Sequence, residues 1–347
     1  MRKLCFIVGI LLVLTGCGVQ TQVQNSEEEP SLQPEGSYNE SSVSETVEEE
    51  QKIDTSVEDM FEVKDGILLR YKGSYQKEIK IVLPKSVKTI GENAFLLNKK
   101  EREMATSLKM SHLDIPSNIK LEKNAFTGAG PLKVKLLEGR KKVEKSAFRD
   151  MGKFGCESEV TLADSIQIID EYAFCVDGGV VVNLSNNLQR VEKFGLNGAS
   201  ISSLPDSLVY LGEEALGHPG KAVEKMPDHI EELGSSCIRL YGDRIHVPAN
   251  VRNIALNAVV WDECNNSDVQ GYDVDQDNPY YKSDENGWLY SKDGKILYYA
   301  YRLENEDDIV IPSGVEKVYK EGLHLYDDDL APGEHVQIVG KEQVKFI

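Results

Sequence analysis

Oxygen-bearing side chains alternate along one acidic stretch of the sequence, Asp273-x-Asp275-x-Asp277-Asn278, and Asp284 follows at the twelfth position counted from Asp273. Alternating oxygen ligands bind Ca²⁺ in loops of about twelve residues. The stretch lacks the glycine and the final bidentate glutamate of such loops. Two alternatives therefore stay open for residues 273–284, a calcium site or an ordinary turn that leads into the next element.

Histidine, cysteine, serine and glycine residues do not occur at the spacings of known catalytic or phosphate-binding motifs. The sequence contains no HExxH, GxSxG, GxxxxGK, GxGxxG or CxxC motif, and its six histidines are scattered. Carboxylates are abundant, but no catalytic pair stands out among them. We therefore predict no catalytic residue and no cofactor, name no metal ligands while the calcium alternative at 273–284 stays open, and do not expect an enzyme.

Aromatic residues gather between positions 261 and 326, which include both tryptophans and nine of the fifteen tyrosines. The stretch WLYSKDGKILYYAY predicts a β-hairpin around Asp293-Gly294, so alternate aromatic side chains should face opposite sides. They either pack across the hairpin and only stabilise it, or leave a Tyr/Trp surface that binds a protein or a glycan. The candidate ligand-binding residues are Trp288, Tyr290, Tyr298, Tyr299 and Tyr301.

The elements that position these residues are copies of one pattern, first seen as VLPKSVKTIGENAF at residues 82–95. Each copy ends in an apolar anchor, preceded directly by a small residue and five positions earlier by an aliphatic one. Anchors recur every 20 to 31 residues apart from one gap of 64, which indicates a solenoid of mutually stabilising coils. The nine anchors are Phe95, Phe126, Phe148, Phe174, Leu196, Leu216, Ile238, Val259 and Leu323.

Each copy can be interpreted physically. An apolar or alternating segment such as KIVLP predicts a short parallel strand, which proline ends because it has no N–H to donate. The IGENAF part predicts a tight turn into a short helical turn. The second copy lacks one residue, so that Ile115-Pro116 is shifted, and the third has Arg140 where the others have an aliphatic residue. The fold class expected is α/β, a single solenoid with a hairpin insert at about residues 265–305.

The pattern resembles the BspA-like, or Treponema-type, leucine-rich repeats, whose copies run apolar, Ile-Pro, Val, Ile-Gly, Ala-Phe. VLPKSVKTIGENAF and IPSGVEKVYKEGL fit this pattern, and DNPYYKSDENGWLYSKDGKILYYA is similar to the strand-rich insert of such proteins. The resemblance covers most of residues 61–347. It implies a leucine-rich repeat solenoid, and it says little about function because the family is defined by its architecture.

The first residues of the chain predict export. Arg2 and Lys3 precede an apolar run that ends in Leu14-Thr15-Gly16-Cys17, which resembles a bacterial lipobox. We expect residues 1–16 to be a lipoprotein signal peptide and Cys17 to carry the lipid that holds the protein on a membrane. The alternative is an ordinary signal peptide or an uncleaved anchor. Residues 17–60 are polar and rich in glutamate, which predicts a disordered linker.

Charge and cysteine content limit the partners. Of the net charge of −19, residues 18–60 contribute −11, the signal +2 and residues 61–347 the remaining −10, and this moderately acidic repeat region disfavours nucleic acid as a partner. Cys237 stands at a small-residue position, where a buried thiol is the expected state. Cys156 and Cys175 lie on neighbouring coils, so they are either a disulfide or two free thiols.

Three function classes follow from the sequence. The first is a surface-displayed recognition or adhesion module, anchored through Cys17, that binds an extracellular protein or glycan. The second is a passive structural protein of the envelope, and the third, least favoured, is a metal-dependent enzyme. The first class accounts best for a lipid anchor, a flexible linker and a repeat surface in one chain.

Overall fold

The computed structural model describes residues 59–217, 225–238, 244–255, 258, 271–300, 308–323 and 337–347. All of these residues lie in one compact unit, Ile53–Ile347. The predictions for residues 1–16 and most of 17–60 therefore lie outside the described residues, as do those for the anchor Val259 and for Trp261 and Tyr301.

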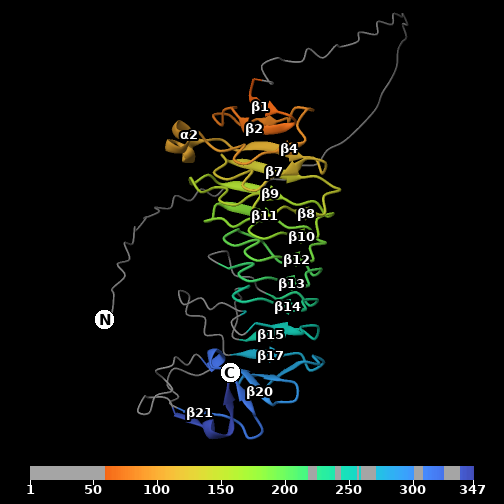
Figure 1. Ribbon diagram of the computed structural model, residues 1–347, viewed down its shortest axis with the longest axis vertical. Helices are drawn as coiled ribbons and strands as arrows, with labels where there is room; N and C mark the ends of the chain where they lie inside the picture. The colour runs from red at the N-terminus through yellow and green to blue at the C-terminus, as the bar shows by residue number, and fades with distance from the viewer. Residues whose placement is uncertain are drawn as a thin grey trace, which may run out of the picture. The chain divides into compact units, whose positions relative to one another are not determined.

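Successive coils stack their strands in parallel, one coil after the next (Figure 1). The strand before each corner alternates buried and exposed residues, as in Leu132–Leu136, and its neighbours pair with it in register. This first sheet has the order β11-β9-β7-β5-β3. Its strands are β3 (Lys80–Ile81), β5 (Ser111–Ile115), β7 (Leu132–Leu136), β9 (Ser158–Thr161) and β11 (Val180–Asn183).

A second column of parallel strands, which the sequence analysis did not predict, runs along the aliphatic position five before each anchor. It comprises β2-β4-β6 in the first coils and β16-β14-β13-β12-β10-β8 in the later ones. Each short strand pairs two residues with the next, for example Ile169 with Val143 and Val191. The strands are β2 (Ile67–Tyr71), β4 (Thr89–Ile90), β6 (Lys120–Leu121), β8 (Lys142–Val143), β10 (Ile168–Ile169), β12 (Arg190–Val191), β13 (Tyr210–Leu211), β14 (Glu232–Leu233) and β16 (Asn253–Ile254).

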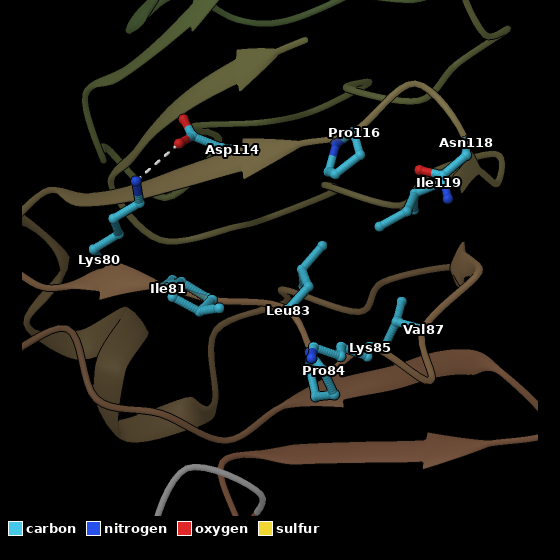
Figure 2. Close-up of a pocket in the computed structure, with 11 residues that line it drawn as sticks. Lys80, Ile81, Leu83, Pro84, Lys85, Val87, Asp114, Pro116, Asn118 and Ile119 are labelled. Carbon is cyan, nitrogen blue, oxygen red and sulfur yellow. Dashed lines mark ion pairs between the residues drawn. The ribbon is translucent and has the colours of Figure 1, made fainter. Parts of the chain in front are cut away.

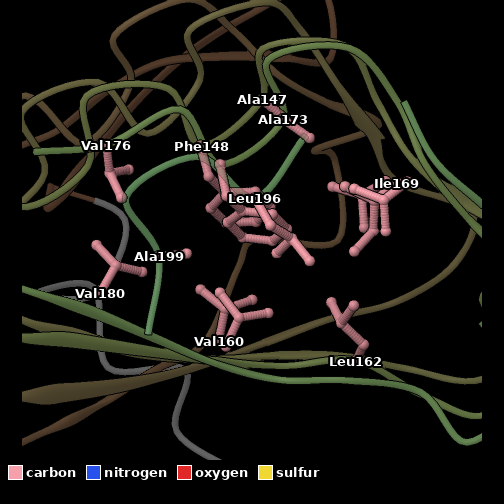
Figure 3. Packing of buried hydrophobic residues seen from close by; sticks show 14 of the residues in the cluster. Ala147, Phe148, Val160, Leu162, Ile169, Ala173, Val176, Val180, Leu196 and Ala199 are labelled. Atoms are coloured by element: carbon pink, nitrogen blue, oxygen red, sulfur yellow. The ribbon is translucent and has the colours of Figure 1, made fainter. Parts of the chain in front are cut away.

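The core lies between these two sheets and the anchors (Figure 3). Phe95, Phe126, Phe148 and Phe174 stack as a ladder, with ring centroids 5.0, 4.6 and 4.9 Å apart. The small and aliphatic positions headed by Ala94 and Ile90 are buried wherever the exposed fraction is described. The predicted solenoid of stacked parallel strands is therefore confirmed, because adjacent coils bury each other's apolar positions.

The turn before each anchor is not the predicted helical turn in most coils. The described segments form hydrogen-bonded turns, and their helices are limited to α2 (Lys99–Glu103), η1 (Ala105–Ser107), η2 (Glu321–Leu323) and η4 (Lys341–Gln343). A left-handed residue two positions before the anchor stops any right-handed helix there. These residues, with φ between 49° and 59°, are Asn93, Asn124, Ser146, Tyr172, Phe194, Glu214 and Ser236.

The solenoid starts with a hairpin, and a similar unit recurs near its other end. Strand β1 (Phe61–Lys64) pairs antiparallel with β2, which pairs parallel with β4. In the later unit, β19 (Leu289–Ser291) pairs antiparallel with β20 (Ile296–Tyr299), which pairs parallel with β22 (Lys317–Val318). The same hydrogen bond follows in each, Tyr71 N to Ala94 O and Ala300 N to Gly322 O. Both hairpins therefore end in a strand that is itself part of a parallel stack.

Further strands connect and extend the later unit. Strand β15 (Ile245–Val247) pairs parallel with β17 (Tyr272–Val274), and β18 (Tyr281–Ser283) pairs antiparallel with β19. Strand β21 (Asp308–Val310) pairs parallel with β23 (Gln337–Val339), and β24 (Lys345–Phe346) pairs parallel with β22. A second buried cluster, which includes Tyr290, Leu297 and Val318, forms the core of this part.

Candidate functional site

The aromatic residues of the hairpin divide between the two buried clusters. Tyr299 is 4 % exposed in the first cluster, where its ring meets Tyr272 edge-on at 5.0 Å, and Tyr290 is 5 % exposed in the second. Tyr298 and Trp288 are half-buried, each against one of the clusters. Tyr298 also stacks on Tyr319 at 5.3 Å. The described candidates therefore all contact a core, and Trp288 and Tyr298 are those that retain exposed surface.

Tyr280, which was not among the candidates, is the most exposed described aromatic residue of this segment, at 50 %. Its neighbour Tyr281 is 8 % exposed, and its hydroxyl accepts a hydrogen bond from Ile254 N at 3.3 Å. The two adjacent rings face opposite sides because successive residues of a strand alternate. The alternation was a usable signal in the sequence, since a Tyr-Tyr pair at a strand start must place one ring outward.

The acidic stretch 273–284 is held by internal contacts. Asp284 accepts hydrogen bonds from Asn286 N, Trp288 N and the Tyr290 hydroxyl, and Asp273 pairs with His246 at 3.4 Å. Asp275 accepts a hydrogen bond from Asp277 N at 2.8 Å. Within the described residues, no group of three or more His, Cys, Asp or Glu side chains is arranged to hold a metal ion. The contacts favour the alternative in which this stretch is a structural turn.

Asn278 ends the same stretch and is fully buried. Its Nδ2 donates to Pro248 O and Val251 O, both at 2.9 Å, and its Oδ1 accepts from Tyr280 N and Tyr281 N. All four bonds go to backbone groups, so the carboxamide joins the corner of the preceding coil to the entry of the hairpin. Burial is tolerated because every polar atom of the side chain is satisfied.

A notch opens between the first two coils, at the copy whose sequence lacks one residue (Figure 2). Leu83, Pro84 and Val87 form one wall, and Pro116, Asn118 and Ile119 form the other. The notch encloses about 320 Å³, and the ion pair between Lys80 and Asp114, at 3.0 Å, lies at one end. It forms because the strands separate after Ile81, the last residue of β3 that pairs with β5.

A second hollow, of about 330 Å³, lies beside the first hairpin. Its polar side chains largely bind one another: Lys72 pairs with Glu62 at 3.1 Å, and Glu101 and Asn98 form the capping box of α2. The Tyr71 hydroxyl is buried without a hydrogen-bond partner among the described residues, and burial raises the pKa of Tyr71 to about 12. This hollow therefore presents few polar groups to a ligand.

The outward face of the first sheet carries ion pairs between neighbouring strands. Lys133 pairs with Glu159 at 2.8 Å and His112 lies 2.9 Å from Glu78. Exposed pairs of this kind contribute little to stability. These pairs place charges of both signs on this face.

The repeats themselves match a family model. Residues 100–219 match the model described as a BspA type leucine rich repeat region, in six copies. These residues form a BspA-type leucine-rich repeat region. The match covers the coils from α2 to Gly217, which include β5 to β13 and most of the phenylalanine ladder.

Several solved structures are similar to this chain at low identity. They are the pneumococcal vaccine antigen PcpA (18 % identity, 74 % of this chain, TM-score 0.32), a leucine-rich repeat protein from Eubacterium ventriosum (15 %, 82 %, 0.35) and a leucine rich cell surface protein from Faecalibacterium prausnitzii (16 %, 74 %, 0.40). The chain spans 57, 57 and 62 % of their respective lengths. These values are too low to transfer any property of those proteins. No curated protein matches the chain.

Both cysteines of the leucine-rich repeat region are free thiols, so the alternative of a disulfide between Cys156 and Cys175 is not realised. Burial raises the pKa of Cys156 to about 11, and it raises the pKa of Cys175 as well. Cys237, beyond the region, is fully buried at its small-residue position, as predicted, and burial raises its pKa to about 12. The buried thiols of Cys156 and Cys237 act as small apolar groups.

The described part of the leucine-rich repeat region and its flanks shows no converging set of catalytic side chains. None of the helices in the described residues has the length and apolar character needed to cross a bilayer. Two features of the described residues with open surface are the notch and the exposed ring of Tyr280 in the later segment.

Proposed function

We propose that the protein is a cell-surface recognition or adhesion module that presents its leucine-rich repeat solenoid to an extracellular protein or glycan. Residues 1–16 act as the signal peptide, Cys17 carries the lipid, and residues 17–60 form the linker that holds the solenoid away from the membrane. The main support is the stack of coils itself, because a solenoid offers a rigid surface that is much larger than a single coil could maintain.

The hairpin insert supplies the contact surface in this proposal. Trp288 and Tyr298 are half-buried while packing on a core, and Tyr280, earlier in the same segment, is 50 % exposed. Rings held in this way lose little freedom on binding, and tyrosine and tryptophan are enriched among residues that dominate binding energy. Tyr290, Tyr299 and Tyr301 were candidates on the same grounds, and the first two would act by supporting the exposed rings.

Replacing Tyr280 by alanine should weaken binding by about 1 to 4 kcal/mol and leave the melting temperature nearly unchanged. Its exposed ring contacts a partner without contributing much to the core. A protein and glycan array screen of the full chain, followed by titration of any ligand found, provides the measurement. Tyr281→Ala is the matched control. Tyr281 is the buried neighbour of Tyr280, so its replacement should lower the melting temperature of the protein.

Two array results would contradict the proposal. If no protein or glycan binds, the passive envelope role replaces recognition. If a ligand binds and Tyr280→Ala, Trp288→Ala and Tyr298→Ala all leave its affinity unchanged, the hairpin is structural and the contact lies elsewhere on the solenoid.

The anchor has a separate test. Mass spectrometry of the membrane-extracted protein should find Cys17 as the amino-terminal residue, with a diacylglyceryl group on its sulfur. Cys17→Ser should release the protein from the membrane fraction, because the thiol is the site of modification. A wild-type product that is soluble and cut at another position would rule out the lipid anchor.

A further inference from the structure

Charge is divided unequally along the solenoid. Residues 61–150 contain 20 lysine and arginine residues and 11 aspartate and glutamate residues, which gives a net charge of +9. Residues 151–347 contain 16 of the former and 35 of the latter, which gives −19. The moderately acidic average of residues 61–347 therefore combines a basic first part, with the strands from β1 to β8, and a strongly acidic remainder.

Three of the basic residues lie along the second column of strands, one on each of three adjacent coils. Lys88 directly precedes β4, Lys120 begins β6 and Lys141 directly precedes β8. Lys120 N donates to Lys88 O at 2.9 Å, which joins the first two coils. Arg140, directly before Lys141, donates to the carbonyl of Ile119, directly before Lys120. All three lysines are exposed, and we call them the lysine row.

The coils set the spacing of the lysine row. The phenylalanine rings of the same three coils are 5.0 and 4.6 Å apart, which is the step from one coil to the next. Paired strands of a sheet lie at the same distance of about 4.8 Å. The lysine row therefore presents positive charges at regular steps along the stack, one ammonium group for each coil.

The lysine row has no counter-charge. None of its three side chains makes an ion pair or a hydrogen bond with another described residue. Further along the same column, the positive side chains are compensated within the protein: Lys142 pairs with Asp170 at 2.8 Å, Arg190 with Glu192 at 2.9 Å and Arg252 with Glu232 at 2.7 Å. The first three coils thus leave unpaired positive charge at the position where later coils form ion pairs.

The chemistry of the lysine row selects the kind of partner. Lysine ammonium groups act as point charges, so they bind carboxylate, sulfate or phosphate without the fixed geometry of an arginine fork. The row contains no aromatic ring, whereas proteins that bind single-stranded nucleic acid stack the bases on such rings. A flat anionic membrane would also face the acidic coils and be repelled by them. A single anionic polymer chain can contact the row alone.

We propose that the lysine row binds a linear anionic polysaccharide, which carries carboxylate, sulfate or phosphate groups along its length. Its charges repeat as the lysines do, and each bound anion compensates ammonium groups that otherwise repel one another. Binding also releases the counter-ions that the polymer holds. The inference rests on the proposed recognition of an extracellular partner and deepens it by naming the class of glycan. It does not depend on the aromatic hairpin.

The test uses the full chain and dextran sulfate, a sulfated glucose polymer, with uncharged dextran of the same length as the reference. Isothermal titration calorimetry should show saturable binding of dextran sulfate and no binding of dextran. Changing Lys88, Lys120 and Lys141 together to glutamine should weaken the binding by at least about tenfold. The slope of log affinity against log salt concentration should become shallower by about one for each lysine removed.

Lys85, Lys109 and Lys135 provide the matched control. They lie between β3 and the end of β7, are exposed and form no ion pair among the described residues, but they stand outside the lysine row. Changing all three to glutamine alters the net charge by the same amount. It should leave the affinity nearly unchanged, because charges further away than about 8 Å are screened at physiological salt. Both triple variants should keep the melting temperature of the unchanged protein, since all six side chains are exposed.

Three results would overturn the proposal. Dextran sulfate shows no saturable binding, or the two triple variants lose affinity equally, so that net charge alone explains the effect. In the third result, single-stranded DNA or vesicles of anionic phospholipid bind through the lysine row more tightly than dextran sulfate, and the partner then belongs to another class. The array test with Tyr280→Ala is independent of all three, because Tyr280 lies outside the basic part of the chain.

Discussion

Phe148→Ala should lower the free energy of unfolding by about 3–5 kcal/mol. The ring is fully buried and lies between Phe126, at 4.6 Å, and Phe174, at 4.9 Å. Its removal leaves a cavity that two neighbouring coils share, and both lose a stacking contact. Urea unfolding followed by circular dichroism measures the loss directly. The effect should be large because the solenoid has no contacts between distant coils to compensate.

Phe194→Ala is the control for this substitution. Its ring is half-buried and stacks on Tyr172 at 5.0 Å, outside the ladder, and its backbone has a φ of 55° that costs energy for a bulky residue. The expected loss is below about 1 kcal/mol. Equal losses for the two variants would show that the ladder does not carry the stability of the coils.

The buried positions of the solenoid could be predicted because they repeat. Small, aliphatic and aromatic residues recur at fixed distances from each anchor, and the structure buries Ala94, Ile90 and Phe95 and their described equivalents, except the half-buried anchor Leu216. A single coil would give no such signal, since a fourteen-residue segment with a few apolar residues fits many folds. The evidence came from the requirement that nine copies bury the same positions.

The second sheet could not be predicted in the same way. Its strands pair only two residues each, such as Ile168–Ile169, which is too short for an alternating pattern to appear. The turn was misread for a related reason, since its left-handed residue is Asn or Ser in some copies but Tyr172 or Phe194 in others. Residue type alone does not reveal that conformation, because the neighbouring coils impose it.

The hairpin had a further signal in the sequence, the recurrence of its turn motif. Lys-Asp-Gly occurs at 64–66 and again at 292–294, each time at the turn of a hairpin whose second strand enters a parallel stack. The aromatic residues therefore lie partly inside a start unit, which explains why Tyr290 and Tyr299 are buried. The notch had a signal too, in the residue missing from the second copy, but only the structure shows that the strands separate there after Ile81.

Arg140 departs from the repeat in another way. It is buried at the position of Val87 and Leu188, where the pattern requires an aliphatic side chain. Its guanidinium donates to Ile119 O and Pro116 O and forms an ion pair with Glu144. The arginine thus closes the corner of the second coil, and the carboxylate of Glu144, four residues later, compensates its charge. Removing one partner of a buried pair costs far more than the pair itself contributes.

Glu144→Ala should therefore destabilise the protein by about 3 kcal/mol, because Arg140, with a side chain only 4 % exposed, keeps its charge without a counter-ion. The value lies at the low end for such changes since the Glu144 side chain is 23 % exposed and water can partly replace it. Combining Arg140→Leu with Glu144→Ala should recover part of the loss, because leucine restores the aliphatic position and no charge remains buried. Urea unfolding of Glu144→Ala and of the double variant measures the two free energies of unfolding that are compared. If the double variant is less stable than Glu144→Ala alone, the hydrogen bonds from Arg140 to the corner carbonyls outweigh the cost of its unpaired charge, and the arginine is retained for closing the coil.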